Sequence, residues 1–166
     1  QINRYQRDSF WAGAGLFGYV QVFVISNGTH TKYYSNTVRL SQITENQSGR
    51  REVKAAASKS FEFTSWWSDA ANNPITDLVD FTRTFFAKHT LLAVLTRYCV
   101  LTVENQLMVM RPYQIAATEA ILRRINSATL NKQTGRLAAG GYIWHTTGSG
   151  KTLTSFKTAK LAAGME

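Results

Sequence analysis

Cysteine, proline and acidic side chains are all scarce in this chain of 166 residues. The one cysteine, Cys99, excludes a disulfide within the chain, and such sparing use of cysteine is typical of a reducing, cytoplasmic setting. No apolar run reaches the roughly 18 residues that a membrane-spanning helix needs, and no secretory signal pattern opens the sequence. A membrane protein and a disulfide-stabilised secreted scaffold are therefore disfavoured.

The charge of the chain is strongly basic, because 19 lysine and arginine residues stand against 10 aspartate and glutamate residues, for a net charge of +9. Such a surplus favours polyanionic partners, and nucleic acid is the first to consider. Hydrophobic residues make up 44% and aromatic residues 12% of the sequence. That composition supports a packed core rather than a disordered chain.

Strands are predicted in the first part of the chain. Residues 19–26 are β-branched and aromatic and predict a buried strand, which Asn27 and Gly28 end with a turn. Residues 31–34 predict a second short strand, and the aromatic segment 61–67 is also strand-like. The residues from Leu40 to Ser60 are polar and predict an exposed loop or linker.

The middle of the chain predicts helices. We expect Pro74 in the first turn of a helix, with Asn72 or Asn73 as its cap. The apolar residues that follow form a stripe at helical spacing: Leu78, Val79, Phe81, Phe85 and Phe86. The aromatic residues of this stripe are expected in the core, and Cys99 is expected to be buried. A second helical stretch is predicted around residues 91–98, and a short strand at 107–110.

Pro112 suits the first position of a further helix, where its missing N–H costs nothing. The side chains expected on one face of that helix are Ile115, Thr118, Leu122 and Ile125. Residues 131–135 predict a polar loop, and residues 138–144 predict a strand that ends in a glycine-rich turn.

That turn carries the most specific motif in the chain: Thr147, Gly148, Ser149, Gly150, Lys151 and Thr152. A Gly-Ser-Gly-Lys-Thr run between a strand and a helix predicts a phosphate-binding loop. Glycines let the backbone N–H groups point at an anion, and the helix that follows directs its positive end there. We expect Lys151 to contact the β- and γ-phosphates of ATP, and the Thr152 hydroxyl to bind Mg²⁺.

The motif departs from the general pattern at one position, because His145 stands where glycine or alanine is usual. This departure disfavours kinases and small GTPases more than helicase-type motors. Upstream, Gln114 lies near the start of the predicted helix, and many helicases read adenine with such a glutamine amide, which is both donor and acceptor. Tyr113 or Arg111 would then pack on the base. A capped helix with an exposed glutamine is the alternative.

Taken together, these residues resemble the restriction and motor (R) subunit of type I restriction–modification enzymes. The resemblance covers nearly the whole chain and is carried by residues 3–11, 23–29, 61–67, 110–114 and 140–157. It implies a RecB-like nuclease domain of the PD-(D/E)xK class, followed by two RecA-like helicase domains. Such a subunit uses ATP and Mg²⁺ to pump and cut double-stranded DNA, together with methylation and specificity subunits.

The nuclease of that family carries a Gln-x-x-x-Tyr motif, which Gln1 and Tyr5 match. On a helix these two side chains share one face, and both would reach the scissile strand. The nuclease carboxylates are expected upstream of Gln1, and the second acidic motif of the motor is expected downstream of Glu166. We therefore expect an isolated chain to hydrolyse no ATP and to cut no DNA.

The fold class implied by the resemblance is α/β, with the end of a nuclease domain joined to the first strand and phosphate loop of a helicase domain, both incomplete. Residues 1–40 would belong to the nuclease domain and 41–60 to an exposed linker. Residues 61–110 would form a helical connection, and 111–166 the start of the first helicase domain.

Two other interpretations stay open on the residues alone. Another superfamily-2 DNA helicase or translocase would share the glycine-rich loop, but not the segments 1–11 and 61–67. A non-catalytic DNA-binding module would use the basic linker together with Arg123 and Arg124. Salt-dependent duplex binding without nucleotide dependence would favour that module.

Overall fold

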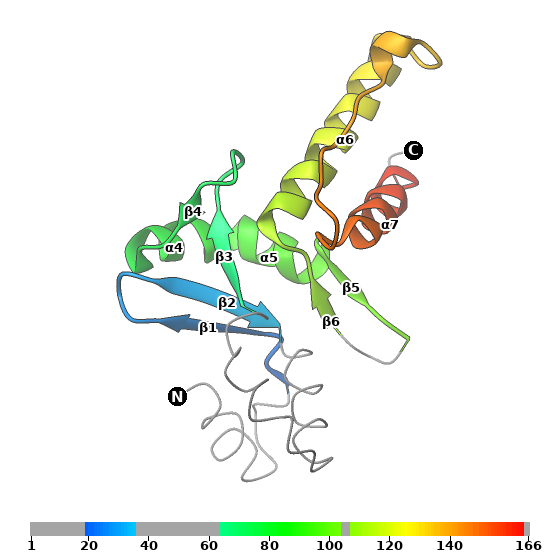
Figure 1. The fold of residues 1–166 in the computed structure, drawn as a ribbon. Helices are drawn as coiled ribbons and strands as arrows, with labels where there is room; N and C mark the ends of the chain where they lie inside the picture. Colours follow the sequence, from blue (N-terminus) through cyan, green and yellow to red (C-terminus); the bar gives the residue numbers. More distant parts are fainter. Residues whose placement is uncertain (1–18, 36–63, 104–106, 165–166) are drawn as a thin grey trace. The chain divides into compact units, whose positions relative to one another are not determined.

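The computed structural model describes residues 19–35, 64–103 and 107–164, and its elements group into two compact units (Figure 1). The first unit lies within Gln1–Trp67 and Pro74–Val109, and the second comprises Ser68–Asn73 and the residues from Met110 onward. The predicted linker at 41–60 lies outside the described residues. Within the described ranges, no helix combines the length and apolar character needed to cross a membrane.

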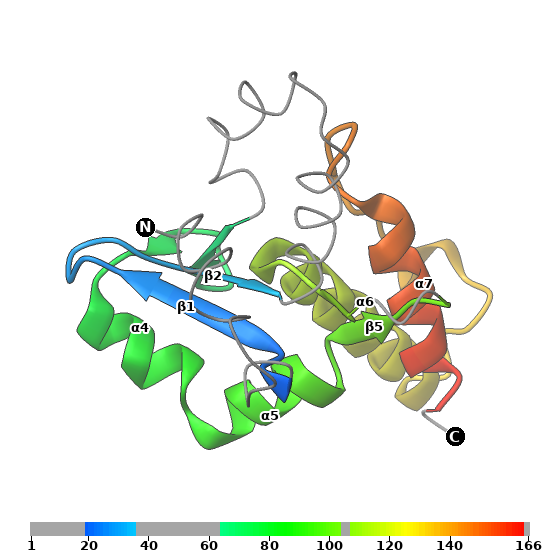
Figure 2. The ribbon, with the colours of Figure 1, turned by 90° about the horizontal axis from the view of Figure 1, so that it is seen from below.

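The first unit is built on a four-stranded sheet in the order β1-β2-β3-β4. Its strands are β1 (Val22–Ser26), β2 (Thr31–Ser35), β3 (Ser65–Ser68) and β4 (Pro74–Ile75). The first two strands form an antiparallel hairpin in which Val24 lies opposite Tyr33 (Figure 2). The strand predicted at 19–26 is confirmed for residues 22–26, of which 22–25 are half-buried rather than buried, and residues 19–21 lie outside it. The strand predicted at 31–34 is confirmed, and β3 confirms the end of the strand predicted at 61–67.

The hairpin turn has the geometry that its residues predict. Gly28 adopts a φ of +95°, where a side chain would be strained. The side-chain carbonyl of Asn27 accepts hydrogen bonds from the backbone N–H groups of Thr29 at 3.2 Å and His30 at 2.8 Å. This local bonding closes the turn and fixes the register of β1 against β2.

Two helices, α4 (Leu78–Phe85) and α5 (Lys88–Thr96), pack on this sheet. The buried core of the unit consists of Tyr33, Phe81, Phe85 and Val94. Phe81 and Phe85 are fully buried, as predicted, but Phe86 is 45% exposed, and its ring lies nearly perpendicular to those of Phe81 and Phe85. The expectation that all the aromatic residues of this stripe are core is therefore wrong for Phe86.

The start of α4 also differs from the prediction. Asp77 is the N-cap, and its carboxylate accepts hydrogen bonds from the N–H groups of Val79 and Asp80. Pro74 lies instead in β4, and Asn72 adopts a φ of +67° in the turn before it. Asp77 is the cap because α4 begins at Leu78, whereas Asn72 and Asn73 precede β4 and lie too far along the chain from the free N–H groups of the helix.

A second sheet of the first unit pairs β5 (Cys99–Leu101) with β6 (Leu107–Val109), antiparallel. The strand predicted at 107–110 is confirmed, whereas β5 follows directly after the helix and was not predicted. Cys99 is only half-buried, contrary to expectation, and its thiol donates to the carbonyl of Leu95 at 3.0 Å.

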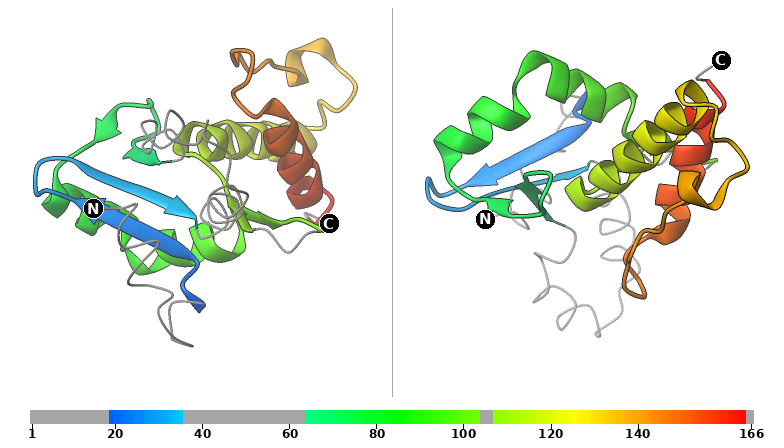
Figure 3. Two further views of the ribbon diagram at one scale, coloured as in Figure 1. Left: turned by 60° about the horizontal axis from the view of Figure 1, so that its bottom comes forward. Right: turned by 90° about the horizontal axis from the view of Figure 1, so that it is seen from above.

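From Met110 onward, the second unit contains two helices and the segment between them: α6 (Pro112–Leu130), the short 3₁₀ helix η4 (Leu137–Ala139) and α7 (Lys151–Ala162). Pro112 occupies the first position of α6, as predicted. The two long helices lie side by side (Figure 3), joined by a buried hydrogen bond between the hydroxyls of Thr158 and Thr118 at 3.1 Å. Of the predicted inner face of α6, Thr118 and Leu122 are buried, but Ile125 is 40% exposed.

The strand predicted at 138–144 is wrong. Its first residues form η4, and residues 140–146 run without regular secondary structure. Tyr142 and Trp144 are almost fully exposed, at 87% and 88%. A strand exists only beside a hydrogen-bonded neighbour, and none of the described strands pairs with this segment.

Candidate functional site

The glycine-rich motif forms a tight turn that leads into a helix. Gly148 and Gly150 adopt φ angles of +78° and +76°, in the left-handed region. The backbone N–H and the hydroxyl of Ser149 both donate to the carbonyl of Thr146, at 3.3 and 2.7 Å. These bonds close the loop on itself immediately before α7 begins at Lys151.

The N-terminus of α7 points out of this turn. Gly150 is the N-cap, and no side chain among the described residues caps the helix there. Twelve residues of helix direct their dipole along the axis, so the exposed backbone N–H groups at this end carry partial positive charge. Such an end is suited to an anion.

Lys151 and Thr152 occupy the first two positions of α7 and are both exposed. The ammonium group of Lys151 donates to the carbonyl of Thr146 at 3.0 Å, so its charge lies over the loop. A carbonyl is a weaker partner for an ammonium than an anion is, and a phosphate would therefore compete well for this lysine. The bond between Lys151 and the Thr146 carbonyl was not predicted, because a backbone carbonyl is present in every residue type and gives no sequence signal.

Gln114 links the start of α6 to the loop. Its side-chain N–H group donates to the carbonyls of Ser149 at 3.1 Å and Gly150 at 3.2 Å, while its side-chain oxygen accepts from the N–H of Arg111 at 2.8 Å. The residue is 4% exposed. Both halves of the amide are thus engaged within the chain, and they hold the loop against α6.

Tyr113 and His145 complete the contacts around the loop. The Tyr113 hydroxyl donates to the carbonyl of Ser149 at 2.8 Å, and its ring meets that of His145 edge-on at 5.6 Å. His145, which departs from the general loop pattern, therefore has a packing partner. Arg111 precedes α6 and is exposed.

The loop residues predicted to act together, 147–152, are thus gathered with Gln114 and Tyr113 in one place. The arrangement offers backbone N–H groups, one ammonium and one hydroxyl around a helix end, which is a donor set for a phosphorylated ligand. Gln1 and Tyr5 lie outside the described residues. Within the described ranges, no group of three His, Cys, Asp or Glu side chains is placed to hold a metal ion.

Two family models match separate parts of the chain. Residues 1–42 match "Type I restriction enzyme R protein N terminus", and residues 113–165 match "SWI2/SNF2 ATPase". The second match begins at Tyr113 and includes the whole glycine loop and α7.

Several curated proteins are similar to the chain. It is 46% identical over 133 residues, 80% of its length, to the type I restriction enzyme EcoprrI endonuclease subunit of Escherichia coli. It is 39% identical over 162 residues, 97% of its length, to the type I restriction enzyme SsaAORF53P endonuclease subunit of Staphylococcus saprophyticus. The chain spans 37% of the length of the first relative and 14% of that of the second.

Proposed function

This chain belongs to the type I restriction enzyme endonuclease (R) subunits, and we propose that residues 147–152 are the ATP-binding loop of such a subunit. One observation carries the proposal: the turn closed by Ser149, with an uncapped helix end and an exposed lysine, lies inside the segment that matches an ATPase family.

The loop residues fit the phosphates of ATP and its magnesium ion. The backbone N–H groups of Gly148 and of residues 150–152 would hold the phosphate oxygens, and Lys151 would exchange the Thr146 carbonyl for a phosphate. The Thr152 hydroxyl is the Mg²⁺ ligand that we propose. An added Cβ at Gly148 would meet no atom within 4 Å, so there is open space beside the loop. Bound ATP with Mg²⁺ would supply the chemical energy for translocation.

The start of α6 is proposed to serve the same nucleotide. Gln114 and Tyr113 hold the carbonyls of the loop and so support its shape directly. Contact between Gln114 and adenine requires its amide to change partners, because both ends are already bonded within the chain. Arg111 is exposed, and we propose it as a residue that packs on the base.

For the whole subunit we propose an ATP-dependent translocase and endonuclease that acts on double-stranded DNA in the cytoplasm, with methylation and specificity subunits. Residues 1–40 would be nuclease, with Gln1 and Tyr5 at the scissile strand, and 41–60 linker. Residues 61–110 would connect to the helicase domain that begins at 111–166. The match of residues 1–42 to the N terminus of the R protein supports this order of domains.

The experiment compares Lys151→Ala with Lys160→Ala in the intact R subunit. Lys160 lies in the last turn of the same helix and is exposed, so it controls for loss of one charge from α7. We expect Lys151→Ala to weaken Mg-ATP binding, measured by calorimetry, roughly 10- to 100-fold and to abolish translocation. Lys160→Ala is expected to bind ATP as the wild type does. Equal affinities for the two variants would refute the assignment.

A second comparison tests whether DNA cutting and ATP hydrolysis reside in separate segments of the subunit. Tyr5→Ala is expected to keep ATP hydrolysis and lose DNA cutting, because the tyrosine belongs to the nuclease in this proposal. Equal loss of both activities would argue against a separate nuclease segment at residues 1–40.

A further inference from the structure

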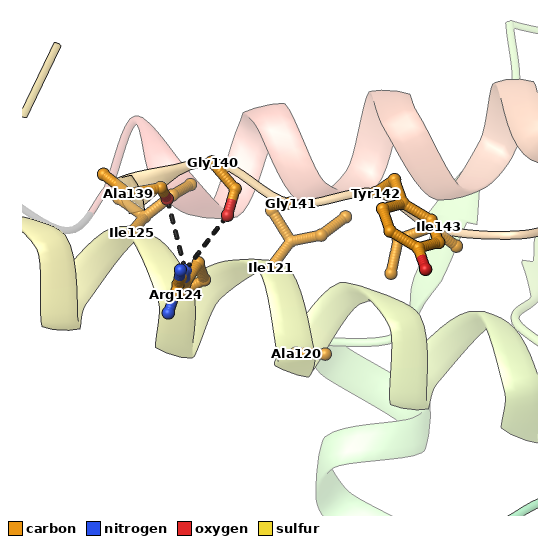
Figure 4. Close-up of a pocket in the computed structure, with 9 residues that line it drawn as sticks. All are labelled: Ala120, Ile121, Arg124, Ile125, Ala139, Gly140, Gly141, Tyr142 and Ile143. Carbon is orange, nitrogen blue, oxygen red and sulfur yellow. Dashed lines mark hydrogen bonds between the residues drawn. The ribbon is translucent and has the colours of Figure 1, made fainter. Parts of the chain in front are cut away.

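Arg124, in the middle of α6, holds the segment that leads into the glycine loop. Its guanidinium donates to three successive backbone carbonyls, with Nε at 3.2 Å from those of both Ala139 and Gly140 and an Nη group bonded to that of Ala138. Figure 4 shows the guanidinium reaching from the helix to the chain that passes over it. From the sequence, Arg124 was considered only as part of a DNA-binding module, and this contact was not predicted.

These exposed carbonyls are free to accept from a side chain outside their own segment. They lie at the end of the 3₁₀ helix η4, where the last C=O groups accept no hydrogen bond from within the helix. A positively charged side chain is favoured at such an end. Arginine suits the position because its planar group presents five donors in a fixed fork. Three carbonyls can then share one side chain.

Apolar packing beneath the segment is incomplete. A cavity of about 700 Å³ lies between α6 and residues 139–143, lined on the helix side by Ala120, Ile121 and Ile125 (Figure 4). Tyr142 is 87% exposed and Ile143 is 41% exposed, so neither side chain anchors the chain firmly. The hydrogen bonds of Arg124 therefore contribute much of the interaction that holds this segment against α6.

The segment ends at the loop. Its last residue, Thr146, accepts hydrogen bonds from Ser149 and Lys151 through one carbonyl. The far side of the loop is held by Gln114 from the first turn of the same helix α6. One helix thus holds the loop from both directions, by Gln114 on the exit side and by Arg124 on the entry side.

We propose that Arg124 is a positioning residue for the glycine loop, and that its contacts with residues 138–140 set the affinity for ATP without touching the nucleotide. This inference rests on the proposed function. Without the hydrogen bonds of Arg124, residues 138–146 sample more conformations, and ordering the loop around phosphates costs more entropy. The groups that would contact the phosphates stay unchanged, so the turnover of bound ATP is preserved.

The test uses Arg124→Ala in the intact R subunit, with Arg123→Ala as the matched control. Arg123 is the neighbouring arginine, and its Nε donates only within α6, to the carbonyl of Glu119 at 3.3 Å. Both substitutions favour helix equally, because alanine is the best helix former. We expect Arg124→Ala to raise the Kd and the KM for Mg-ATP roughly tenfold, with kcat changed less than about twofold.

Hydrogen exchange gives a second readout that does not depend on activity. In the nucleotide-free subunit, the backbone amides of residues 141–147 are expected to exchange faster in Arg124→Ala than in the wild type or in Arg123→Ala. Arg124→Lys keeps the charge but lacks the fork, so intermediate values of both Kd and exchange rate are expected. This variant also decides the matter if Arg124→Ala does not fold.

Wild-type affinity in Arg124→Ala, or a raised Kd without faster exchange at 141–147, would overturn the inference. Matching losses in Arg123→Ala and Arg124→Ala would also overturn it. Lys151→Ala distinguishes a failure of the proposed function from a failure of the inference about Arg124. Intact ATP binding in Lys151→Ala would overturn the proposed function and the inference with it, whereas loss there beside normal binding in Arg124→Ala would overturn the inference alone.

Discussion

The side-chain amide of Gln114 donates to the backbone carbonyl of Gly150 at 3.2 Å, and a Cβ on residue 150 would lie only 2.5 Å from the same nitrogen. Gly150 also adopts a φ of +76°. Two independent constraints therefore require glycine at this position: the left-handed backbone and the close approach of the glutamine. The contact that supports the loop is also what excludes a side chain from it.

Gly150→Ala is expected to destabilise the protein more than Gly148→Ala does. Both glycines have nearly the same positive φ, at +76° and +78°, so alanine costs roughly 1–2 kcal/mol of backbone strain at either position. Only at Gly150 does the new Cβ also displace Gln114, since a Cβ at Gly148 meets no atom within 4 Å. Urea unfolding of the nucleotide-free protein measures the difference, and equal losses of stability would show that the Gln114 contact is not tight.

Gln114→Glu is expected to destabilise the loop more than Gln114→Ala. A carboxylate can still accept from the N–H of Arg111, but it has no donor for the carbonyls of Ser149 and Gly150 and places negative charge beside them. The carbonyl of Ser149 keeps the Tyr113 hydroxyl and that of Gly150 keeps the N–H of Thr154, so we expect each lost bond to cost only about 1 kcal/mol. Thermal unfolding compares the two variants. Because protonation restores a donor, the gap between them is expected to narrow as the pH is lowered.

Gln133→Ala, at an exposed glutamine in the loop after α6, is the control for that comparison. It is expected to unfold as the wild type does. A Gln114→Glu protein as stable as Gln114→Ala at neutral pH would contradict the donor role assigned to the amide.

The loop and the start of α6 could be predicted because their signals are local. Gly148 and Gly150 permit the turn, and Pro112 fits the first position of a helix whatever surrounds it. The partner of Gln114 could not be predicted in the same way, since an amide that can read adenine can equally well bond two backbone carbonyls.

The wrong predictions concern segments whose structure is determined by contacts with residues elsewhere in the chain. Residues 140–144 have the aromatic and β-branched side chains of a strand, but a strand also needs a neighbour, and none of the described strands lies beside them. Pro74 follows two asparagines that resemble helix caps, yet Asp77 captures the N–H groups of α4 instead. Phe86 continues a helical stripe, but α4 ends at Phe85, so its ring leaves the core face.

Phe85→Ala is expected to destabilise the first unit by about 3–5 kcal/mol, because the ring is fully buried and its loss leaves a cavity. Trp67 reports the change, since its ring meets that of Phe85 edge-on at 5.2 Å. Tryptophan fluorescence during urea unfolding gives the free energy. Phe86→Ala is the matched control, and at 45% exposure we expect it to cost less than half as much. Similar costs for both would place Phe86 in the core after all.

Asp69, in the turn between β3 and β4, has a pKa below its usual value of 3.8, chiefly because the side chain of Asn73 donates to the carboxylate. The backbone N–H groups of Asn73 and Ala71 lower the pKa further. A carboxyl with a lowered folded-state pKa stabilises the turn above its unfolded pKa, and that stability is lost as the pH falls through the folded value. We therefore expect the contribution of Asp69 to be constant at neutral pH and to disappear only in strong acid.

The carbon-13 shift of the Asp69 carboxyl, followed by NMR between neutral and acid pH, tests this account. Asn73→Ala removes the side-chain donor but keeps the backbone N–H, so we expect the midpoint of the Asp69 titration to rise toward 3.8 without reaching it. Asn72→Gly changes the neighbouring residue, whose φ of +67° glycine adopts readily, and leaves both Asn73 contacts in place. Its midpoint is expected at the wild-type value. A midpoint that moves equally in the two variants would mean that the shape of the turn, and not the amide of Asn73, sets the pKa of Asp69.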